Sequence, residues 1–263
     1  MNALTVLASG GDEFQAPGPE LFDFPPLFAG GPAWLTKPVV FAVVGSLVVC
    51  VFFWSAFAKP KLVPRGVQNL GEVGYMFVRD EIARPFLGKK TDQWMPLLMS
   101  MFFLIWIWNI FAVVPVIQFP IASHIAFPIV LALFVYILKV YLGLRHQGIR
   151  YFTNMIPSGL PWPVYILLVP IEYLSTFVLA PFTHAVRLFA NMFAGHTILA
   201  FFSLVGFWFI FEKPTVAGFG VGIIGVLVTI AMTALELLIQ FLQAFLFTML
   251  AAMYIQSGLE ADH

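Results

Sequence analysis

The chain has 263 residues, of which 61% are hydrophobic and 10% are charged, and its 13 basic and 13 acidic side chains balance. So apolar a composition excludes a water-soluble globular domain and indicates a protein of the lipid bilayer. The balanced charge argues against a basic surface for nucleic acid, and the single cysteine, Cys50, excludes a disulfide or thiolate metal site within one chain.

The amino-terminal part predicts a tail, one crossing and one interfacial helix. Residues 1–36 are acidic and contain prolines, without the basic start and apolar core of a cleaved signal peptide, so we expect an extracytoplasmic tail. Residues 38–57 form an apolar run, and about 20 apolar residues in a helix span the hydrocarbon. In residues 66–88 apolar side chains recur at helical spacing beside charged ones, which is typical of an amphipathic helix at the membrane surface.

Further along the chain the apolar segments become longer. From Gln93 to Leu138 there is no Asp, Glu, Lys or Arg, which suits crossings at 94–114 and 123–143 with a proline-rich turn between them. Residues 163–211 and 217–256 are each about twice the length that one crossing needs, since 40 helical residues extend about 60 Å against about 30 Å of hydrocarbon. We therefore expect two long, steeply tilted helices joined as an antiparallel hairpin.

The predicted fold class is all-α: a polytopic membrane protein, in a single integral membrane domain, with about five membrane-crossing helices, one amphipathic interfacial helix and this carboxyl-terminal hairpin. Basic side chains concentrate in residues 59–90 and 139–150, and the positive-inside rule places these segments in the cytoplasm. An odd number of crossings then leaves the amino terminus outside and the carboxyl terminus in the cytoplasm. Lys139, Arg145 and Arg150 are interpreted as the return to an aqueous face.

Arg187 stands in a long apolar run, and a charged side chain at membrane depth usually marks an ion path, a proton relay or a counter-ion site. Two interpretations stay open. In one, Arg187 is paired inside the bundle and fixes helix packing. In the other, its partner belongs to another subunit, because the spanning segments of this chain offer few carboxylates and an unpaired buried charge is costly.

The hairpin predicts which polar residues lie at the same depth. With the turn centred near Thr215, residues whose numbers sum to about 430 are level, which pairs Arg187 with Gln243. It likewise pairs His196 with Glu236 to within a residue or two. Glu236 is interpreted either as a protonated carboxyl hydrogen-bonded for structure or as a group that passes protons, with His196 as its titratable neighbour. Gln243 is interpreted as a supporting hydrogen-bonding group.

Other polar side chains accompany Arg187 on the first long helix. At about 100° per residue, His184 and Asn191 lie within about 60° of Arg187, and we interpret both as supporting hydrogen-bonding groups. His196 projects to the opposite side of this helix. Glu172 lies nearer the predicted cytoplasmic side, where it is either a functional carboxylate or a solvated one.

Two motifs resemble the a subunit family of F-type ATP synthases. They are RLFANMFAGH, Arg187–His196, and ELLIQFLQAFLFTML, Glu236–Leu250, and their combination at this separation is more specific than either alone. The preceding PIEYLSTFVLAPFTH, Pro170–His184, is similar to the family's approach to its arginine. The resemblance runs from the first spanning helix to the end of the chain, and it implies the same two long, tilted helices that the segment lengths require.

The resemblance implies roles for the polar residues. Arg187 corresponds to the family's essential arginine, which faces the carboxylate of each c subunit as the ring turns. Glu236 and His196 correspond to the proton relay of the outer half-channel, where their positions are exchanged in some members. Asn191 and Gln243 match polar positions near the arginine.

Other positions match the family less closely. Glu172 corresponds loosely to a position on the cytoplasmic exit side. Ala180 stands where many members carry a basic residue, which leaves local interface contacts open.

The resemblance also implies a function and partners. The function is that of a proton-conducting stator subunit, with two offset half-channels that load and unload protons on the c-ring carboxylates and so couple proton flow to rotation. The partners are the c-subunit ring, the peripheral-stalk b subunits, the remaining ATP synthase complex and membrane lipid, without nucleic acid. We expect no cofactor, no metal and no catalysis by the chain alone, and a bacterial plasma membrane rather than an organellar inner membrane.

A self-contained ion-coupled secondary transporter is the alternative function, in which Arg187 would bind an anionic substrate. That class predicts repeated halves and paired broken helices, and no such internal repeat is visible in the sequence. A membrane hydrolase has less support, because the sequence holds no recognisable arrangement of nucleophile and base and no clustered metal-ligand spacing.

Overall fold

The computed structural model describes residues 14, 16–22, 24–28, 32–114, 117–156, 161–212 and 214–259. In this part of the chain five helices are long and apolar enough to cross a membrane. The predicted all-α polytopic fold class is thereby confirmed. Residues 1–13 of the predicted amino-terminal tail lie outside the described part.

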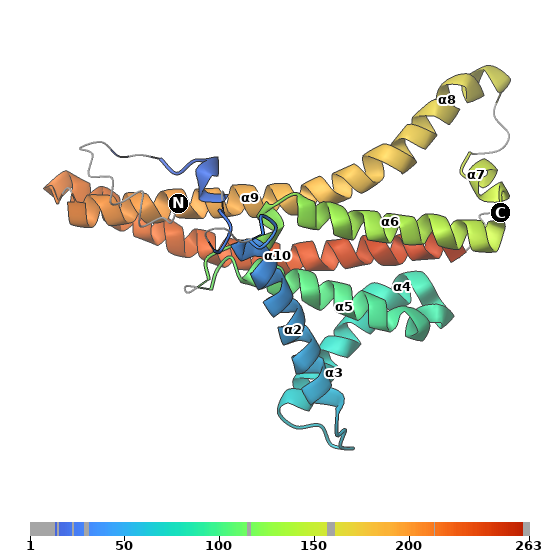
Figure 1. Cartoon of the computed structure of the whole chain (residues 1–263), viewed down its shortest axis with the longest axis horizontal. Helices are drawn as coiled ribbons and strands as arrows, with labels where there is room; N and C mark the ends of the chain where they lie inside the picture. Colours follow the sequence, from blue (N-terminus) through green and yellow to red (C-terminus); the bar gives the residue numbers. More distant parts are fainter. Residues whose placement is uncertain are drawn as a thin grey trace. The chain divides into compact units, whose positions relative to one another are not determined.

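Nine α-helices follow one another along the described chain (Figure 1): α2 (Lys37–Phe57), α3 (Val67–Phe77), α4 (Arg84–Leu87), α5 (Thr91–Ile110), α6 (Ala126–Gln147), α7 (Arg150–Asn154), α8 (Trp162–Leu174), α9 (Ala180–Phe207) and α10 (Val216–Leu259). Short 3₁₀-helical segments lie at Pro19–Phe22, Gly88–Lys90 and Ile121–Ser123. Segments of π-helix lie at Val78–Ala83, Ser175–Leu179 and Trp208–Glu212.

A glycine separates the amphipathic segment from the crossing that follows it. Gly88 ends α4 with a φ of +50°, a conformation that side chains with a Cβ rarely adopt. The next crossing, α5, begins at Thr91, whose Oγ1 donates a hydrogen bond of 2.7 Å to the Gly88 carbonyl. Arg79 and Asp92 join the two sides of the break through a salt bridge of 3.1 Å. The two sides of Gly88 are therefore held together at a defined point within Val67–Ile110, which as a whole is one of the five long apolar helical segments.

The two long helices of the predicted hairpin have the lengths that require tilting. The segment Trp162–Glu212 has 51 residues and Val216–Leu259 has 44, whereas about 20 residues suffice for one crossing. The first is not uniform. Pro170 inside α8 lacks an N–H donor, and the π-helical segment Ser175–Leu179 begins just over one turn after it.

The chain falls into two compact units, and α9 and α10 each contribute to both. The first unit comprises Met1–Ser46, Trp106–His124 and Phe189–Leu242, and the second comprises Leu47–Ile105, Ile125–Leu188 and Gln243–His263.

In the first unit, glycines bring α9 and α10 into backbone contact. A Cβ added to Gly225 would lie 2.9 Å from the Gly206 nitrogen and 3.0 Å from its Cα. One added to Gly222 would lie 3.2 Å from the Gly206 oxygen. The numbers of these contacting residues sum to about 430, which is the predicted register of the hairpin. Small residues of this kind are the usual means by which membrane helices approach closely.

We expect Gly225→Val to destabilise the protein by about 1–3 kcal/mol, because the added side chain meets backbone atoms that have no rotamer with which to move away. Gly220→Val is the matched control on the same helix, since a Cβ at Gly220 has open space around it. The measurement is the midpoint of thermal denaturation in detergent. Equal midpoints for the two variants would contradict the close crossing.

In the second unit, α6 packs against the carboxyl-terminal part of α10 (Figure 1). A Cβ added to Gly258 would lie 2.9 Å from Leu142 Cβ and 3.0 Å from the Lys139 carbonyl oxygen. The interpretation of Lys139 as a return to an aqueous face is wrong, because its side chain is buried, with 8% exposed. The helix continues to Gln147, and the exposed basic residues near its end are Arg145 and His146.

Candidate functional site

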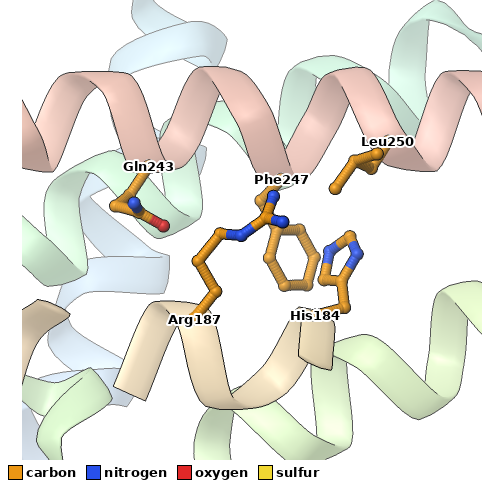
Figure 2. A pocket seen from close by; sticks show the side chains of 5 residues that line it. All are labelled: His184, Arg187, Gln243, Phe247 and Leu250. Atoms are coloured by element: carbon orange, nitrogen blue, oxygen red, sulfur yellow. The ribbon is translucent and has the colours of Figure 1, made fainter. Parts of the chain in front are cut away.

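In the second unit, the start of α9 and the end of α10 form a small pocket around Arg187. Figure 2 shows Arg187 and His184 projecting from α9, while Gln243, Phe247 and Leu250 come from α10. The predicted register placed Gln243 level with Arg187, and both residues line this pocket.

Arg187 is exposed although it lies within an apolar helix. Its side chain extends from α9 toward α10 (Figure 2), and among the described residues it forms no salt bridge. An arginine at membrane depth is costly unless it meets a counter-charge, a polar cavity or the interface. The first of the two interpretations, in which Arg187 is paired inside the bundle, requires a carboxylate partner. The described part of the chain provides none.

His184 is buried beside Arg187 and packs on aromatic rings. Its imidazole meets the ring of Phe247 edge-on, with centroids 3.8 Å apart at 84°, and the Tyr254 ring centroid lies 6.0 Å away. Neither imidazole nitrogen has a hydrogen-bond partner among the described residues. The contacts of His184 are therefore those of a packed ring that flanks the arginine.

Glu172 lies outside the pocket, on α8 in the same unit. Its side chain is half-buried, and its Oε1 accepts a hydrogen bond of 3.4 Å from Thr176 Oγ1. The Thr176 carbonyl in turn accepts a hydrogen bond from the Tyr136 hydroxyl on α6. Glu172 is thus a carboxylate held by α8 and tied through Thr176 to α6.

In the first unit, Glu236 is buried against α9. It is 4% exposed, and a Cβ added to Gly195 would lie 3.8 Å from its carboxyl carbon and from Oε1. The side chain of Gln240, one turn later on α10, interacts with this carboxyl. The carboxyl of Glu236 therefore lies beside Gly195, where an added Cβ would be in ordinary van der Waals contact with it.

His196 follows Gly195 on α9 and is partly covered by the amino-terminal segment. Its ring packs edge-on to Phe22, with centroids 5.9 Å apart, and its Nδ1 is buried without a described hydrogen-bond partner. Asn191, also in the first unit, is half-buried. The seven predicted residues therefore divide, with Glu236, His196 and Asn191 in one unit and Arg187, His184, Gln243 and Glu172 in the other.

Asn109 is a polar residue of the first unit that the sequence reasoning missed. It lies on α5, is fully buried, and its Nδ2 donates a hydrogen bond of 3.4 Å to the Gln240 carbonyl. The Gln240 side chain, one turn after Glu236 on α10, is also fully buried. The sequence feature that could have identified Asn109 is its amide side chain, which stands alone within the apolar run predicted as the crossing 94–114.

The two sets of residues suit different chemistry. Buried polar atoms normally form hydrogen bonds with protein or with ordered water. The carboxyl, imidazole and amide groups of the first unit can therefore hold water among them, and such an arrangement suits the passage of protons. The exposed guanidinium of the second unit suits attraction of an anion. Among the described residues no group of three or more His, Cys, Asp or Glu side chains is arranged to hold a metal ion.

Comparison with known proteins gives consistent results. The family model described as ATP synthase A chain matches residues 39–256. A protein of Streptomyces lividans named ATP synthase subunit a is 41% identical over 95% of this chain and 89% of its own length. Proteins of the same name from Frankia alni and Rhodococcus erythropolis are 41% and 39% identical, over 95% and 98% of this chain and 87% and 95% of their own lengths.

Proposed function

The chain belongs to the ATP synthase A chain family, and from this premise we propose that it is the proton-conducting stator subunit of an F-type ATP synthase. It is a multi-pass membrane protein and a membrane subunit of that complex. In the proposed function it provides two offset half-channels, which load protons onto the carboxylates of a c-subunit ring and unload them. It performs no catalysis alone.

The observation that carries the proposal is the exposed guanidinium of Arg187, which forms no salt bridge within the described part of the chain. A charge in this position is stabilised when an opposite charge approaches it in a medium of low dielectric constant. As the ring turns, each c subunit in turn brings a carboxylate to Arg187 and supplies this opposite charge. Arg187 favours the ionised carboxylate while it faces the stator, and its positive charge opposes a proton that would cross directly between the half-channels.

Proton entry is proposed to run through the polar group of the first unit. Glu236 and His196 are the relay, and Gln240 and Asn109 supply amide groups to the same buried surroundings. Each of these four side chains carries a buried polar atom, which favours ordered water among them, and water joins groups that do not touch directly. A proton from the outside passes this group and neutralises a c-subunit carboxylate, which then rotates into lipid.

Proton release is proposed to run through the second unit. After nearly a full turn the c-subunit carboxyl gives up its proton toward the cytoplasm, with Glu172 as the acceptor, while His184 and Gln243 flank Arg187. Asn191 is proposed as a supporting polar residue in the first unit. Each proton moving down 100 mV supplies about 2.3 kcal/mol, which rotation carries to the catalytic sector.

The surrounding partners are part of the proposal. The exposed face at Arg187 meets the c-ring, peripheral-stalk b subunits and lipid cover other apolar faces, and the complex lies in a bacterial plasma membrane. The amino terminus is outside and the carboxyl terminus is in the cytoplasm, following the basic segments.

Cysteine cross-linking tests which face meets the ring. Thr183 is exposed one turn before Arg187, so Thr183→Cys in a Cys50→Ser background should form a disulfide with a cysteine placed beside the c-subunit carboxylate. Val51→Cys on α2 is the matched control, because Val51 is 59% exposed but belongs to another helix. Equal yields from the two positions, measured on denaturing gels of the oxidised complex, would contradict the assigned face.

A further inference from the structure

In the first unit, the amino-terminal segment places an aromatic ring directly on a member of the proposed relay. Phe22, at the end of the 3₁₀-helical residues Pro19–Phe22, is 5% exposed. Its ring lies against the Phe193 ring with centroids 4.5 Å apart, and it meets the His196 imidazole edge-on at 5.9 Å and 64°. Phe193 and His196 lie nearly one turn apart and share one face of α9. Phe22 therefore covers this face at the position of His196.

Aromatic contacts attach the chain on both sides of Phe22. Before it, the Phe14 ring packs edge-on against Phe201 of α9, with centroids 5.8 Å apart. After it, the Phe24 ring packs edge-on against Phe119, with centroids 4.3 Å apart. All of these residues belong to the first unit. Edge-to-face contacts of this kind fix the rings that make them, so the cover over α9 is held from two directions.

An apolar ring at this position treats protons and larger cations differently. A hydrated cation that approaches His196 past Phe22 gives up part of its water, and the ring offers no oxygen or nitrogen atom in return. A proton needs no such space, because it passes between neighbouring hydrogen-bonded groups and single water molecules. The His196 Nδ1 beneath the cover is buried, and Glu236 is 4% exposed. The ring therefore suits a cover that discriminates by size and hydration.

We propose that Phe22 is a specificity-determining residue of the proton entry path. Its ring caps His196 on the side of the amino-terminal segment, so that protons reach the relay while larger cations are kept from it. The proposal rests on the proposed function, because it assigns a role within the entry path of Glu236 and His196. Phe22 takes up no proton itself, and its effect is exerted through the access that it leaves to His196.

Phe22→Ala tests the cap in the complete complex, with Zn²⁺ as the probe. Complexes are reconstituted in liposomes with the catalytic sector outward and graded Zn²⁺ in the lumen, which is the side of the proposed entry path. Zn²⁺ binds imidazole nitrogen and carboxylate oxygen, the two kinds of group in the relay. ATP synthesis is driven by a fixed pH difference and a potassium diffusion potential. The rate of each variant is expressed relative to its own rate without zinc.

We expect Phe22→Ala to be half-inhibited at about tenfold less Zn²⁺ than the wild type, a difference of about 1.4 kcal/mol in binding free energy. Phe22→Tyr keeps an aromatic ring and should keep the wild-type response. Phe24→Ala is the matched control, because the Phe24 ring lies 6.1 Å from the imidazole of His124, which is not part of the proposed relay. Mg²⁺ prefers oxygen ligands and retains its water, so it should not inhibit any of these complexes.

Equal zinc responses of Phe22→Ala and the wild type overturn the proposal. So does an equal gain of sensitivity in Phe24→Ala, which would indicate general loosening of the amino-terminal segment. Phe22→Val is a milder truncation that also removes the ring edge from His196, and it should show the same gain in sensitivity as Phe22→Ala. Loss of assembly in both truncations would assign Phe22 a packing role and overturn the proposal. Absence of synthesis by zinc-free wild-type complexes would instead contradict the proposed function.

Discussion

Arg187→Ala should abolish coupled ATP synthesis and ATP-driven proton pumping in reconstituted complexes. Two unit charges 4 Å apart at an effective dielectric constant of 20 attract each other by about 4 kcal/mol, which corresponds to about a thousandfold in an equilibrium or a rate. The described part of this chain offers no salt-bridge partner that would retain Arg187 for structural reasons. The variant should therefore assemble with the ring and fail in coupling.

The same variant should also leak protons. With the positive charge removed, nothing at this position opposes direct transfer between the entry and release paths, and the ring carboxylate is no longer held ionised at the stator. Passive proton flow is measured in vesicles from which the catalytic sector has been stripped, after a potassium diffusion potential is imposed. We expect flow that does not require rotation.

Arg145→Ala is the matched control for the loss of an arginine. Arg145 is exposed near the end of α6 and lies outside the Arg187 pocket, so its removal should leave pumping unchanged. Arg187→Lys separates charge from shape, because lysine keeps a positive charge and loses the planar guanidinium fork. If the Arg187→Ala complex pumped protons at the wild-type rate, the role assigned to this arginine would be contradicted.

Much of the fold was predictable from segment length and hydrophobicity. The five long apolar helices follow from composition, because the bilayer sets how many apolar residues a crossing needs. The π-helical segment Ser175–Leu179 was not predicted, because sequence periodicity does not distinguish an α-helix from one that contains a π-turn. The two compact units were not predicted either, since they depend on contacts between distant segments.

The predicted register of the two hairpin helices identified part of the site. The pocket contains both Arg187 and Gln243, and Gly195 contacts Glu236, as a register sum near 430 requires. The surroundings of Lys139 could not be predicted in this way. Its burial depends on Tyr254, more than 100 residues later in the chain, and the positive-inside rule counts basic residues without resolving which of them face water.

Glu236→Gln should impair proton entry while leaving the complex assembled. The amide has nearly the shape of the carboxyl, so packing against Gly195 is retained, but it does not take up and release a proton at neutral pH. A positioned acid or base contributes typically 10²- to 10⁴-fold to a proton transfer. We therefore expect passive proton flow and ATP synthesis to fall by about a hundredfold.

Glu212→Gln is the matched control, because Glu212 is an exposed carboxylate at the end of the other long helical segment, Trp162–Glu212. It should leave both rates unchanged. Loss of assembly in Glu236→Gln would instead favour a structural carboxyl, which is the other interpretation of this residue. Normal proton flow in an assembled Glu236→Gln complex would exclude Glu236 from the entry path altogether.

Exchange of the two relay groups distinguishes a pair from two independent residues. His196→Glu alone places two carboxyls near Gly195, and Glu236→His alone places two imidazoles there, so each single change should reduce flow as strongly as Glu236→Gln. The double variant restores one acid and one imidazole within the same buried surroundings, and should recover at least part of the wild-type flow. Recovery would show that positions 196 and 236 are coupled, because the effects of changes at independent sites simply add.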